Sequence, residues 1–593
     1  MKNSPKFSLR QFITVTSDWL TLQFRRDSES QNHENRSTKN WNLNYWDICL
    51  VLLFLIFACF YFVSRLQYGY PLTRIGGDAA NIASFAAAYD NPKNFQDDGL
   101  LSNLDNIRIY YTIHIPLLRW LNTLVGNYGL GFQLLLIPTV FIQMLSFYLF
   151  GRVWLRSRYW ALLWMVLNLA AIQMIYISEG WGIFEEPVPR FTFQALLPFV
   201  LVLVWIWRDA PWRWVIVMAF TGLLVYVHPV STPAWFAAIL LGFWYLMPTK
   251  WSFFKRLIVL AGLGISGLFV MLPFIITYLS HHIHGVVQNY ELLMKVLTNY
   301  FPSYLLNPPR AILQILIDMT SNGLLPLAIL GFLIVWFRRG YERRKLYLAI
   351  YWMLGLLLVS LIIPSIERII ERMFSLAPFE TELIRGMRYF IFFMELFIIW
   401  GLSELSQIFR KGWASKLVMA SGLLLVLFYL PKAYDVAIAR TLDCFQVGKL
   451  ICEQAVNKDN EHLITAIQER TAPGASFFYS FDATDTRTLE IRYLAKRSLV
   501  YSYKDKGLLA YSNPEQLKNW YQIFEEVNSH KNIIYWAKNN PQNFMDFLKK
   551  YQVDYLILPG NYPENFFANL ETEIVFRNGS YLLLAVPPTI SQP

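Results

Sequence analysis

The stretch LIVLAGLGISGLFVMLPFIITYL, residues 257–279, contains no charged side chain. About 20 consecutive apolar residues allow a helix to cross the hydrocarbon core of a bilayer, so this stretch predicts a membrane span. Of the 593 residues in the whole chain, 55% are hydrophobic and 16% are charged, and the mean hydropathy is +0.34. These values exclude an array of soluble domains and a wholly disordered chain. Four cysteines are too few for a secreted disulfide scaffold.

Apolar runs of about 17 to 25 residues, or shorter runs interrupted by proline, predict eleven spans. They cover residues 46–66, 130–150, 159–177, 191–207, 215–227, 233–247, 257–279, 324–337, 346–363, 390–405 and 413–430. The fifth and sixth are short and could instead form a re-entrant hairpin. The predicted fold class is therefore an α-helical polytopic membrane protein.

The net charge of +11 belongs to the hydrophobic two-thirds of the chain, because basic and acidic residues nearly balance over residues 440–593. Alternate connections between spans are short and basic, and such loops collect on the cytoplasmic side. With an odd number of spans, the N-terminus is expected in the cytoplasm and the C-terminal end outside the plasma membrane. The basic excess is thus an orientation signal and does not indicate a nucleic-acid partner.

Three regions follow from this topology. Residues 1–45 form a cytoplasmic tail without a cleavable signal, which is either an amphipathic helix on the inner leaflet or disordered. Residues 46–434 form the membrane domain, with long outer loops at 67–129, 178–190, 280–323 and 364–389. Residues 435–593 form a small extracytoplasmic α/β domain. Long outer loops carry sites more often than short connections do, so the chemistry is expected at the outer face.

The C-terminal region alternates strand-like runs with polar helical stretches. The strand-like runs are SFFYSF, SLVYSY, VDYLILPG and EIVFRNGSYLLLAV, and the last contains Asn578-Gly579, which predicts a hairpin. The region has no phosphate-binding glycine loop, no zinc spacing and no nucleophile elbow, which favours a recognition or stabilising role over catalysis.

The first outer loop opens with RIGGDAANIASFAAAYD, in which Asp78 starts a helical pattern just beyond the first span. A carboxylate there can act as a base. The alternative is a helix N-cap, since Gly-Gly-Asp before a helix is typical of one.

An acid at this position, about eleven spans and a C-terminal α/β domain resemble the GT-C superfamily of membrane glycosyltransferases, particularly bacterial, cyanobacterial-type members with a segment such as EIRYLAKRSLVYSYKDKG. The resemblance implies a polyprenyl-phosphate-linked sugar as donor in the outer leaflet, and an acceptor that is a glycan, a lipid or a protein. It implies that Asp78 is the general base, although Ala79 stands where the family often has a second acid. A divalent cation, Mg or Mn, is a further expectation.

Other outer-face residues are candidates for the same site. Glu185 and Glu186 could position the acceptor or a metal ion, with Arg190 beside them as a phosphate or carboxylate partner, or they could form an interfacial salt-bridge cluster. His228 could assist them or could be a turn residue. His281, His282 and His284 lack local acid or cysteine partners, which favours an interfacial loop over zinc.

Arg385 and Arg388 lie three residues apart before the tenth span, so a helix would present both on one face toward a lipid phosphate. Snorkelling or pairing with Glu380 and Glu382 is the alternative.

The C-terminal cations Arg492, Arg497, Lys504 and Lys506 are read as solvated charge at a sheet edge. A Cys444–Cys452 disulfide is permitted outside the membrane, but a helix between them would separate their Cα atoms by roughly 12 Å, which is too far for a bond.

Three other functions stay open: a polysaccharide polymerase or ligase, a lipid or solute transporter, and a non-catalytic scaffold for envelope assembly. The few ionisable residues within the spans and the absence of an evident inverted repeat argue against the transporter.

Overall fold

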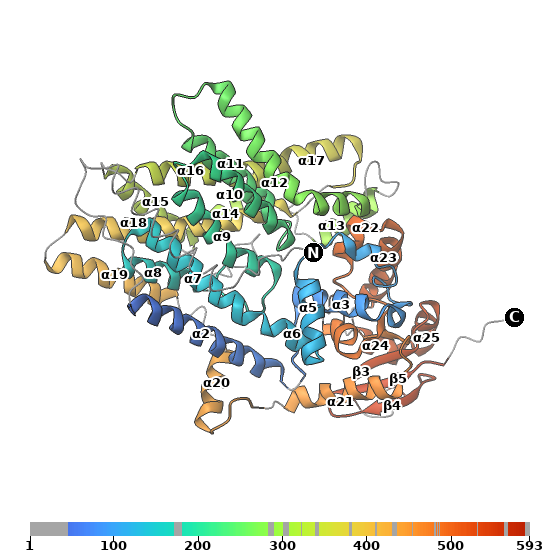
Figure 1. Ribbon diagram of the computed structural model, residues 1–593. Coiled ribbons are helices and arrows are strands. Elements are labelled where there is room, and N and C mark those ends of the chain that lie inside the picture. Colours follow the sequence, from blue (N-terminus) through green and yellow to red (C-terminus); the bar gives the residue numbers. More distant parts are fainter. Residues whose placement is uncertain are drawn as a thin grey trace, which may run out of the picture. The chain divides into compact units, whose positions relative to one another are not determined.

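A computed structural model (Figure 1) describes residues 45–587 except 71, 171–180, 283–289, 301–307, 322, 339–342, 379–381, 410–411, 430–435, 453–454, 480–481, 483, 485–486, 531, 563–566 and 568. The chain divides into two compact units, Met1–Phe57 and Ala58–Pro593. The predicted N-terminal amphipathic helix lies outside the described residues. The predicted domain boundary near residue 435 stays a prediction.

Six helical segments of the described chain are long and apolar enough to cross a membrane. They are Tyr45–Gln67, Tyr128–Leu155, Pro189–Ile206, Phe253–His281, Arg343–Phe374 and Leu383–Ile408. A seventh span is possible if Leu313–Ser321 and Leu324–Phe337, which bend by 84° at their junction, count as one. Three shorter apolar helices cover Pro211–Tyr226, Thr232–Leu246 and Trp413–Tyr429.

Helices occupy the described part of all eleven predicted ranges, so a multi-pass helical fold is confirmed. Six of the eleven predicted spans, or seven with the bent pair, contain a described helical segment that is long and apolar enough to cross a membrane. The described helices in the other predicted ranges are shorter. α8 (Arg158–Leu169) has 12 residues, and α10 (Trp214–Leu223) and α11 (Thr232–Leu246) are separated by a turn that contains Pro229.

Large aromatic side chains fill the interior of the helical bundle. Three almost completely buried tryptophans are Trp154 of α7 (Leu136–Leu155), Trp352 of α16 (Arg343–Leu357) and Trp400 of α18 (Phe390–Ile408). The ring centroid of Trp154 lies 5.5 Å from that of Trp352 and 5.9 Å from that of Trp400. Where α15 (Leu324–Phe337) crosses α18, Gly331 faces Gly401 so closely that a Cβ on either would collide with the backbone of the other helix. Small residues of this kind let membrane helices approach each other.

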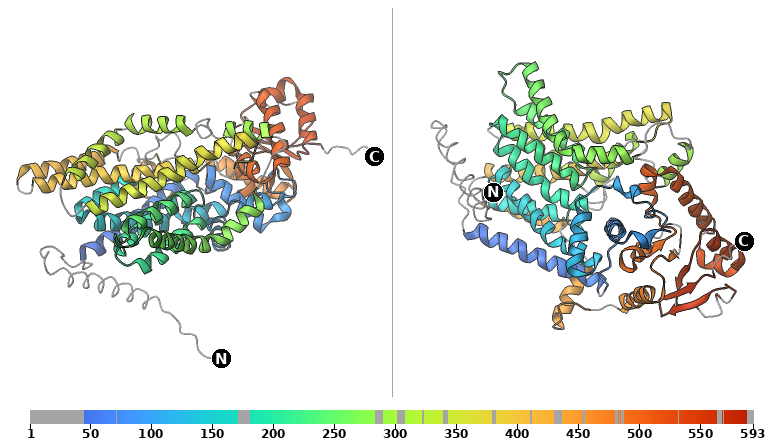
Figure 2. Two further views of the ribbon diagram at one scale, coloured as in Figure 1. Left: turned by 90° about the horizontal axis from the view of Figure 1, so that it is seen from above. Right: turned by 45° about the vertical axis from the view of Figure 1, so that its right-hand side comes forward.

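The loop predicted to be the first outer loop, residues 67–129, is largely helical in its described part. Its main element, α3 (Gly77–Asp90), is rich in alanine and buried along nearly its whole length. It packs against α5 (His114–Val125), α6 (Tyr128–Leu134) and the C-terminal π-helix η8 (Ile491–Ala495). The six alanines of α3 let neighbouring elements approach it closely, and in the right-hand view of Figure 2 this blue helix lies among other helices and the orange C-terminal segments.

The C-terminal region contains a five-stranded mixed sheet of order β2-β1-β3-β5-β4. The strands are β1 (Ser476–Phe478), β2 (Ser498–Leu499), β3 (Tyr555–Pro559), β4 (Glu573–Arg577) and β5 (Tyr581–Ala585). All five fall within the predicted runs, and the antiparallel pairing of β4 with β5 confirms the hairpin at Asn578-Gly579. The predicted polar helices correspond to α23 (Pro514–Ser529) and α25 (Pro541–Lys550).

Cys444 and Cys452 form a disulfide, with their Cα atoms 6.0 Å apart. The distance expected from a continuous helix is wrong, because α20 (Val436–Gln446) ends between the two cysteines and Gly448 turns the chain with a φ of +73°. A positive φ of this size lies in the left-handed region, which glycine adopts readily because it has no Cβ. The N–H of Cys452 also donates to Oε1 of Gln67 at 3.0 Å, which attaches the bridged segment to the end of α2 (Tyr45–Gly69).

The remaining helices complete the chain. They are η1 (Pro92–Phe95), α4 (Asp105–Arg108), α9 (Pro189–Ile206), η2 (Pro211–Arg213), η3 (Leu224–Tyr226), α12 (Phe253–His281), α13 (Tyr290–Tyr300), α14 (Pro308–Ser321), η4 (Leu358–Ile362), α17 (Ile363–Phe374), η5 (Leu383–Tyr389), α19 (Trp413–Tyr429), α21 (Ala455–Arg470), η7 (Arg487–Leu489), α22 (Lys506–Ser512) and α24 (Ile533–Asn539).

Candidate functional site

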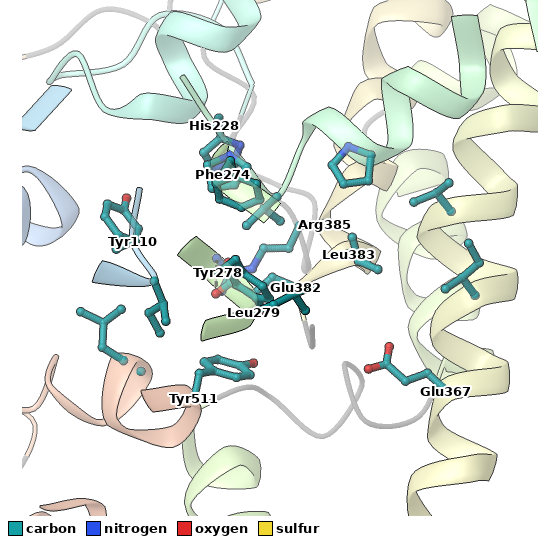
Figure 3. Close-up of a pocket in the computed structure, with 18 of the residues that line it drawn as sticks. Tyr110, His228, Phe274, Tyr278, Leu279, Glu367, Glu382, Leu383, Arg385 and Tyr511 are labelled. Carbon is teal, nitrogen blue, oxygen red and sulfur yellow. Dashed lines mark ion pairs between the residues drawn. The ribbon is translucent and has the colours of Figure 1, made fainter. Parts of the chain in front are cut away.

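A cavity of about 910 Å³ lies where the first outer loop, the bundle and the C-terminal region meet. One wall is mostly apolar and comes from α12 and α17, through residues such as Phe274, Ile366 and Ile370, although Glu367 and Glu371 of α17 also line the cavity. The other end is charged, and its lining includes Asp78, Arg190, His228, Arg385, Arg388 and Lys504. In Figure 3, Arg385 and Glu382 lie near Tyr278 and Leu279, while Tyr511 and Glu367 line separate parts of the wall.

Asp78 lies between two cations. Its Oδ2 is 3.0 Å from Nη1 of Arg190, and its Oδ1 is 3.0 Å from Nζ of Lys504. Burial alone would raise the pKa of Asp78, but Lys504 and then Arg190 outweigh burial and hold the pKa well below its usual range. Asp78 is therefore an ionised carboxylate.

The alternative that Asp78 is a helix cap is wrong. The cap of α3 is Gly76, which makes no side-chain cap hydrogen bond, and Asp78 is already inside the first turn. An acid in the first turn is favoured by the helix dipole, so the helix still stabilises the charge on Asp78.

Arg190 lies in the first turn of α9, where the same dipole disfavours a cation. Its guanidinium lies over the ring of Phe184, with 5.3 Å between its Cζ and the ring centroid, and the ion pair with Asp78 offsets the unfavourable position.

Arg385 and Arg388 are brought together by η5, which is a 3₁₀-helix. Residues three apart in a 3₁₀-helix lie on the same side, so both guanidinium groups reach the cavity as predicted, although from a tighter helix. Arg385 pairs with Glu382, at 3.2 Å between Nη1 and Oε1.

Arg388 is only 4% exposed, and its Nε donates to the carbonyl oxygen of Arg385 at 2.9 Å. Its Nη1 is buried and makes no hydrogen bond to any residue that the structure describes. A buried guanidinium with an unsatisfied N–H costs free energy unless an anion pairs with it.

His228 contacts this cluster as a neutral imidazole. Its Nδ1 lies 2.7 Å from Oγ of Ser231, and the hydroxyl of Tyr389 donates to the same Oγ at 2.7 Å. Burial first, and then nearby Arg388, lowers the pKa of His228. Ser231 therefore links the ring of His228 to the hydroxyl of Tyr389 at the edge of the cavity.

Glu185 and Glu186 do not line the cavity. Glu185 is 71% exposed and pairs with Arg65 at 3.0 Å. Oε1 of Glu186 accepts from the backbone N–H of Gly76 at 2.6 Å, and burial raises the pKa of Glu186 to about 8. Their role in positioning an acceptor stays a prediction.

The reading of the C-terminal cations as solvated sheet-edge charge is wrong. Arg492 is completely buried, Arg497 and Lys506 are 6% and 1% exposed, and Lys504 lines the cavity. Burial first, and then the nearby charge of Lys504, lowers the pKa of Lys506 to about 7. Sequence reasoning missed Lys504 because its partner Asp78 is 426 residues away, and no local pattern reports such a contact.

The residues around Asp78 do not suit a divalent cation. In the part of the chain that the structure describes, no three His, Cys, Asp or Glu side chains are placed to hold a metal ion. The nearest charges to Asp78 are cations, which favour an anionic ligand. His281 lies 3.8 Å from Asp105, and His284 lies outside the described residues.

Comparison with solved structures finds ArnT from Cupriavidus metallidurans, both bound to undecaprenyl phosphate and in the apo state. Each match has 12% sequence identity and a TM-score of 0.35, and covers 92% of this chain and 99% of the other. No family model and no curated protein matches the sequence. We therefore infer the function from the residues of the cavity.

Proposed function

We propose that this protein is a membrane glycosyltransferase that takes a sugar from a polyprenyl-phosphate-linked donor and transfers it to an acceptor at the extracytoplasmic face. The observation that carries the proposal is the joining of two environments in one cavity. Four cations, Arg190, Arg385, Arg388 and Lys504, lie at one end, and an apolar wall from α12 and α17 extends from it.

A lipid phosphate matches both environments. Its phosphate oxygens can accept charge-assisted hydrogen bonds from the arginines, including the unsatisfied Nη1 of Arg388. Its hydrocarbon chain can replace water along the isoleucine and phenylalanine wall, at about 25 cal/mol per Å² of apolar surface. A soluble sugar phosphate would have no use for the apolar wall.

The cations also suit the reaction. As the acceptor oxygen bonds to the anomeric carbon, the bond from that carbon to the phosphate oxygen breaks, and negative charge collects on the departing lipid phosphate. Fixed cations at that point stabilise the transition state more than the ground state.

Asp78 is proposed as the general base that accepts the proton of the acceptor hydroxyl. With Lys504 and Arg190 paired to it, Asp78 is a weak base. A donor phosphate competes for the same cations, and their withdrawal returns basicity to Asp78. Donor binding would then precede proton transfer. A requirement for Mg or Mn stays a prediction, and removal with EDTA followed by metal add-back tests it.

The binding test uses the purified full chain in mild detergent and native mass spectrometry. The probe is a polyprenyl phosphate, and the parent polyprenol is the uncharged control. We expect the phosphate to be retained at least tenfold more strongly than the alcohol. Equal retention of the two lipids would contradict the phosphate site and would favour a lipid transporter or scaffold.

The activity test uses membranes that contain the protein and a panel of radiolabelled polyprenyl-phosphate sugars. Asp78→Asn removes the base without changing size, so it should bind the polyprenyl phosphate and lose transfer of label by about 10²-fold or more. Asp97→Asn, an exposed acid of the same loop, is the matched control and should be as active as the unmodified protein. Full activity of Asp78→Asn would exclude the base assignment.

A further inference from the structure

A second charged cluster lies next to the cavity, but its side chains do not line it. Arg492 of η8 is joined to Asp98 of the first outer loop and to Asp505, which directly precedes α22. The exposed fractions of the three side chains are 0%, 0% and 1%. We call these three residues the clamp.

The clamp is hydrogen-bonded on both sides of the guanidinium. Nε and Nη2 of Arg492 donate to the two carboxylate oxygens of Asp98 at 2.8 and 2.7 Å. Nη1 and Nη2 donate to the two oxygens of Asp505 at 2.6 and 2.9 Å. Two bidentate pairs on one planar group fix the relative orientation of all three side chains.

Asp98 is fixed to its own loop as well. Its Oδ1 accepts from the backbone N–H groups of Leu100 and Leu101 at 2.9 and 2.8 Å, and its Oδ2 accepts from Leu499 N at 2.8 Å. Beside it, the N–H of Gly99 donates to the carbonyl oxygen of Leu499 at 2.9 Å. A Cβ at position 99 would lie 2.6 Å from the carbonyl oxygen of Val500, so only glycine permits this approach.

The clamp ends next to the cavity. Asp505 is the immediate neighbour of Lys504, and Lys504 is the cation that the C-terminal region supplies to Asp78. A lysine has four rotatable side-chain bonds, and its ammonium reaches a defined point only if its backbone is held. The backbone N–H of Asp505 also donates to the carbonyl oxygen of Ser502 at 3.2 Å, which shapes the bend that carries Lys504.

We propose that the Asp98–Arg492–Asp505 clamp is a positioning device that holds Lys504 in the cavity, so that the C-terminal region supplies one of the cations that bind the donor phosphate. This inference rests on the proposed function, because it takes the ligand to be a lipid phosphate. Arg492 touches no part of the cavity and acts only through Lys504.

A double-mutant cycle separates positioning from plain structural support. Lys504→Gln removes the cation, and Asp505→Asn releases one side of the clamp while keeping its shape. The readout is the affinity of the full chain for a polyprenyl phosphate, with the polyprenol as the uncharged control. Asp98→Asn, which keeps an oxygen for the Leu100 and Leu101 amides, is the second release variant if Asp505→Asn does not fold.

If the clamp positions Lys504, each single variant weakens polyprenyl phosphate binding about tenfold and leaves polyprenol binding unchanged. The double variant then binds no more weakly than Lys504→Gln alone, because the clamp has no cation left to position. Additive losses, or a release variant that binds like the unmodified protein, would overturn the inference. Unchanged binding by Lys504→Gln itself would instead overturn the phosphate site of the proposed function.

Discussion

The clamp and the cavity contain the same kinds of side chain in opposite balance. In the clamp, one arginine lies between two carboxylates, and every N–H of its fork that points to them is used. At the charged end of the cavity, Asp78 pairs with Arg190 and Lys504, and Glu382 pairs with Arg385. Nη1 of the fourth cation, Arg388, has no acceptor among the described residues. A saturated network stabilises the fold, whereas a cation-rich one is completed by an anionic ligand.

The strongest way to break this comparison is to remove the cation of the clamp. Arg492→Ala leaves two buried carboxylates without a cation, and we expect a loss of about 3–5 kcal/mol in the free energy of unfolding. The measurement is denaturant unfolding of the full chain in detergent.

Arg470→Ala is the matched control for Arg492→Ala. Arg470 is an exposed arginine of the same region, and its Nη1 donates to the carbonyl oxygen of Val575 at 2.8 Å. We expect its loss to cost less than about 1 kcal/mol. Similar costs for the two substitutions would mean that the clamp contributes no more than surface charge.

The reverse experiment removes a cation from the cavity. Arg388→Gln relieves repulsion among the cations but removes donors for a phosphate, so the free energy of unfolding should stay the same or rise. Affinity for a polyprenyl phosphate should fall about tenfold, which corresponds to about 1.4 kcal/mol. Arg119→Gln, a partly exposed arginine of α5 outside the cavity, should change neither affinity nor specificity. A large loss of stability in Arg388→Gln would show that acidic groups of the protein already balance the charge of the four cavity cations.

The contrast also explains how far the sequence could predict the molecule. Helices in the eleven apolar ranges and strands in the four C-terminal runs depend on local patterns, and the structure has them there. The turn at Gly448 depends on where α20 ends, and helix ends are poorly encoded by apolar periodicity, so the Cys444–Cys452 distance was mispredicted.

The site was predictable only in the part that the loops encode. Asp78, Arg190, Arg385 and Arg388 could be proposed because each lies next to a span on the expected outer side, and all four line the cavity. Lys504 and Arg492 could not, because their partners lie 426 and 394 residues away and only tertiary packing brings them together.

A third prediction concerns two acids near Gly76, Asp78 and Glu186, and tests whether neighbouring cations decide which of them is ionised. Asp78 is kept ionised by its cations, whereas burial raises the pKa of Glu186 from 4.5 to about 8. The folded state therefore holds a proton on Glu186 that the unfolded chain releases near pH 4.5, so stability from this group is present at low pH and is lost as the pH rises to about 8.

Glu186→Gln should remove that slope. Between about pH 4.5 and 8, the free energy of unfolding of the unmodified protein should fall relative to that of the variant, and above pH 8 the difference should stay constant. The charge of Glu185 raises the pKa of Glu186 by less than burial does, so Glu185→Gln should narrow the pH range of the slope without removing it. A slope that Glu186→Gln leaves intact would assign the titration to another group.

The smallest effect is expected where a charge pair is neither buried nor crowded. Lys550 pairs with Glu526 on the surface of the C-terminal region, and the two side chains are 54% and 35% exposed. Water already solvates both groups, so Lys550→Gln should cost at most about 1 kcal/mol, and added salt should reduce even that cost. Unfolding at low and high ionic strength measures both quantities. The contradicting result would be a loss in the free energy of unfolding as large as that of Arg492→Ala and independent of salt. Burial would then not be what makes the clamp stabilising, and the contrast with the cavity would lose its physical basis.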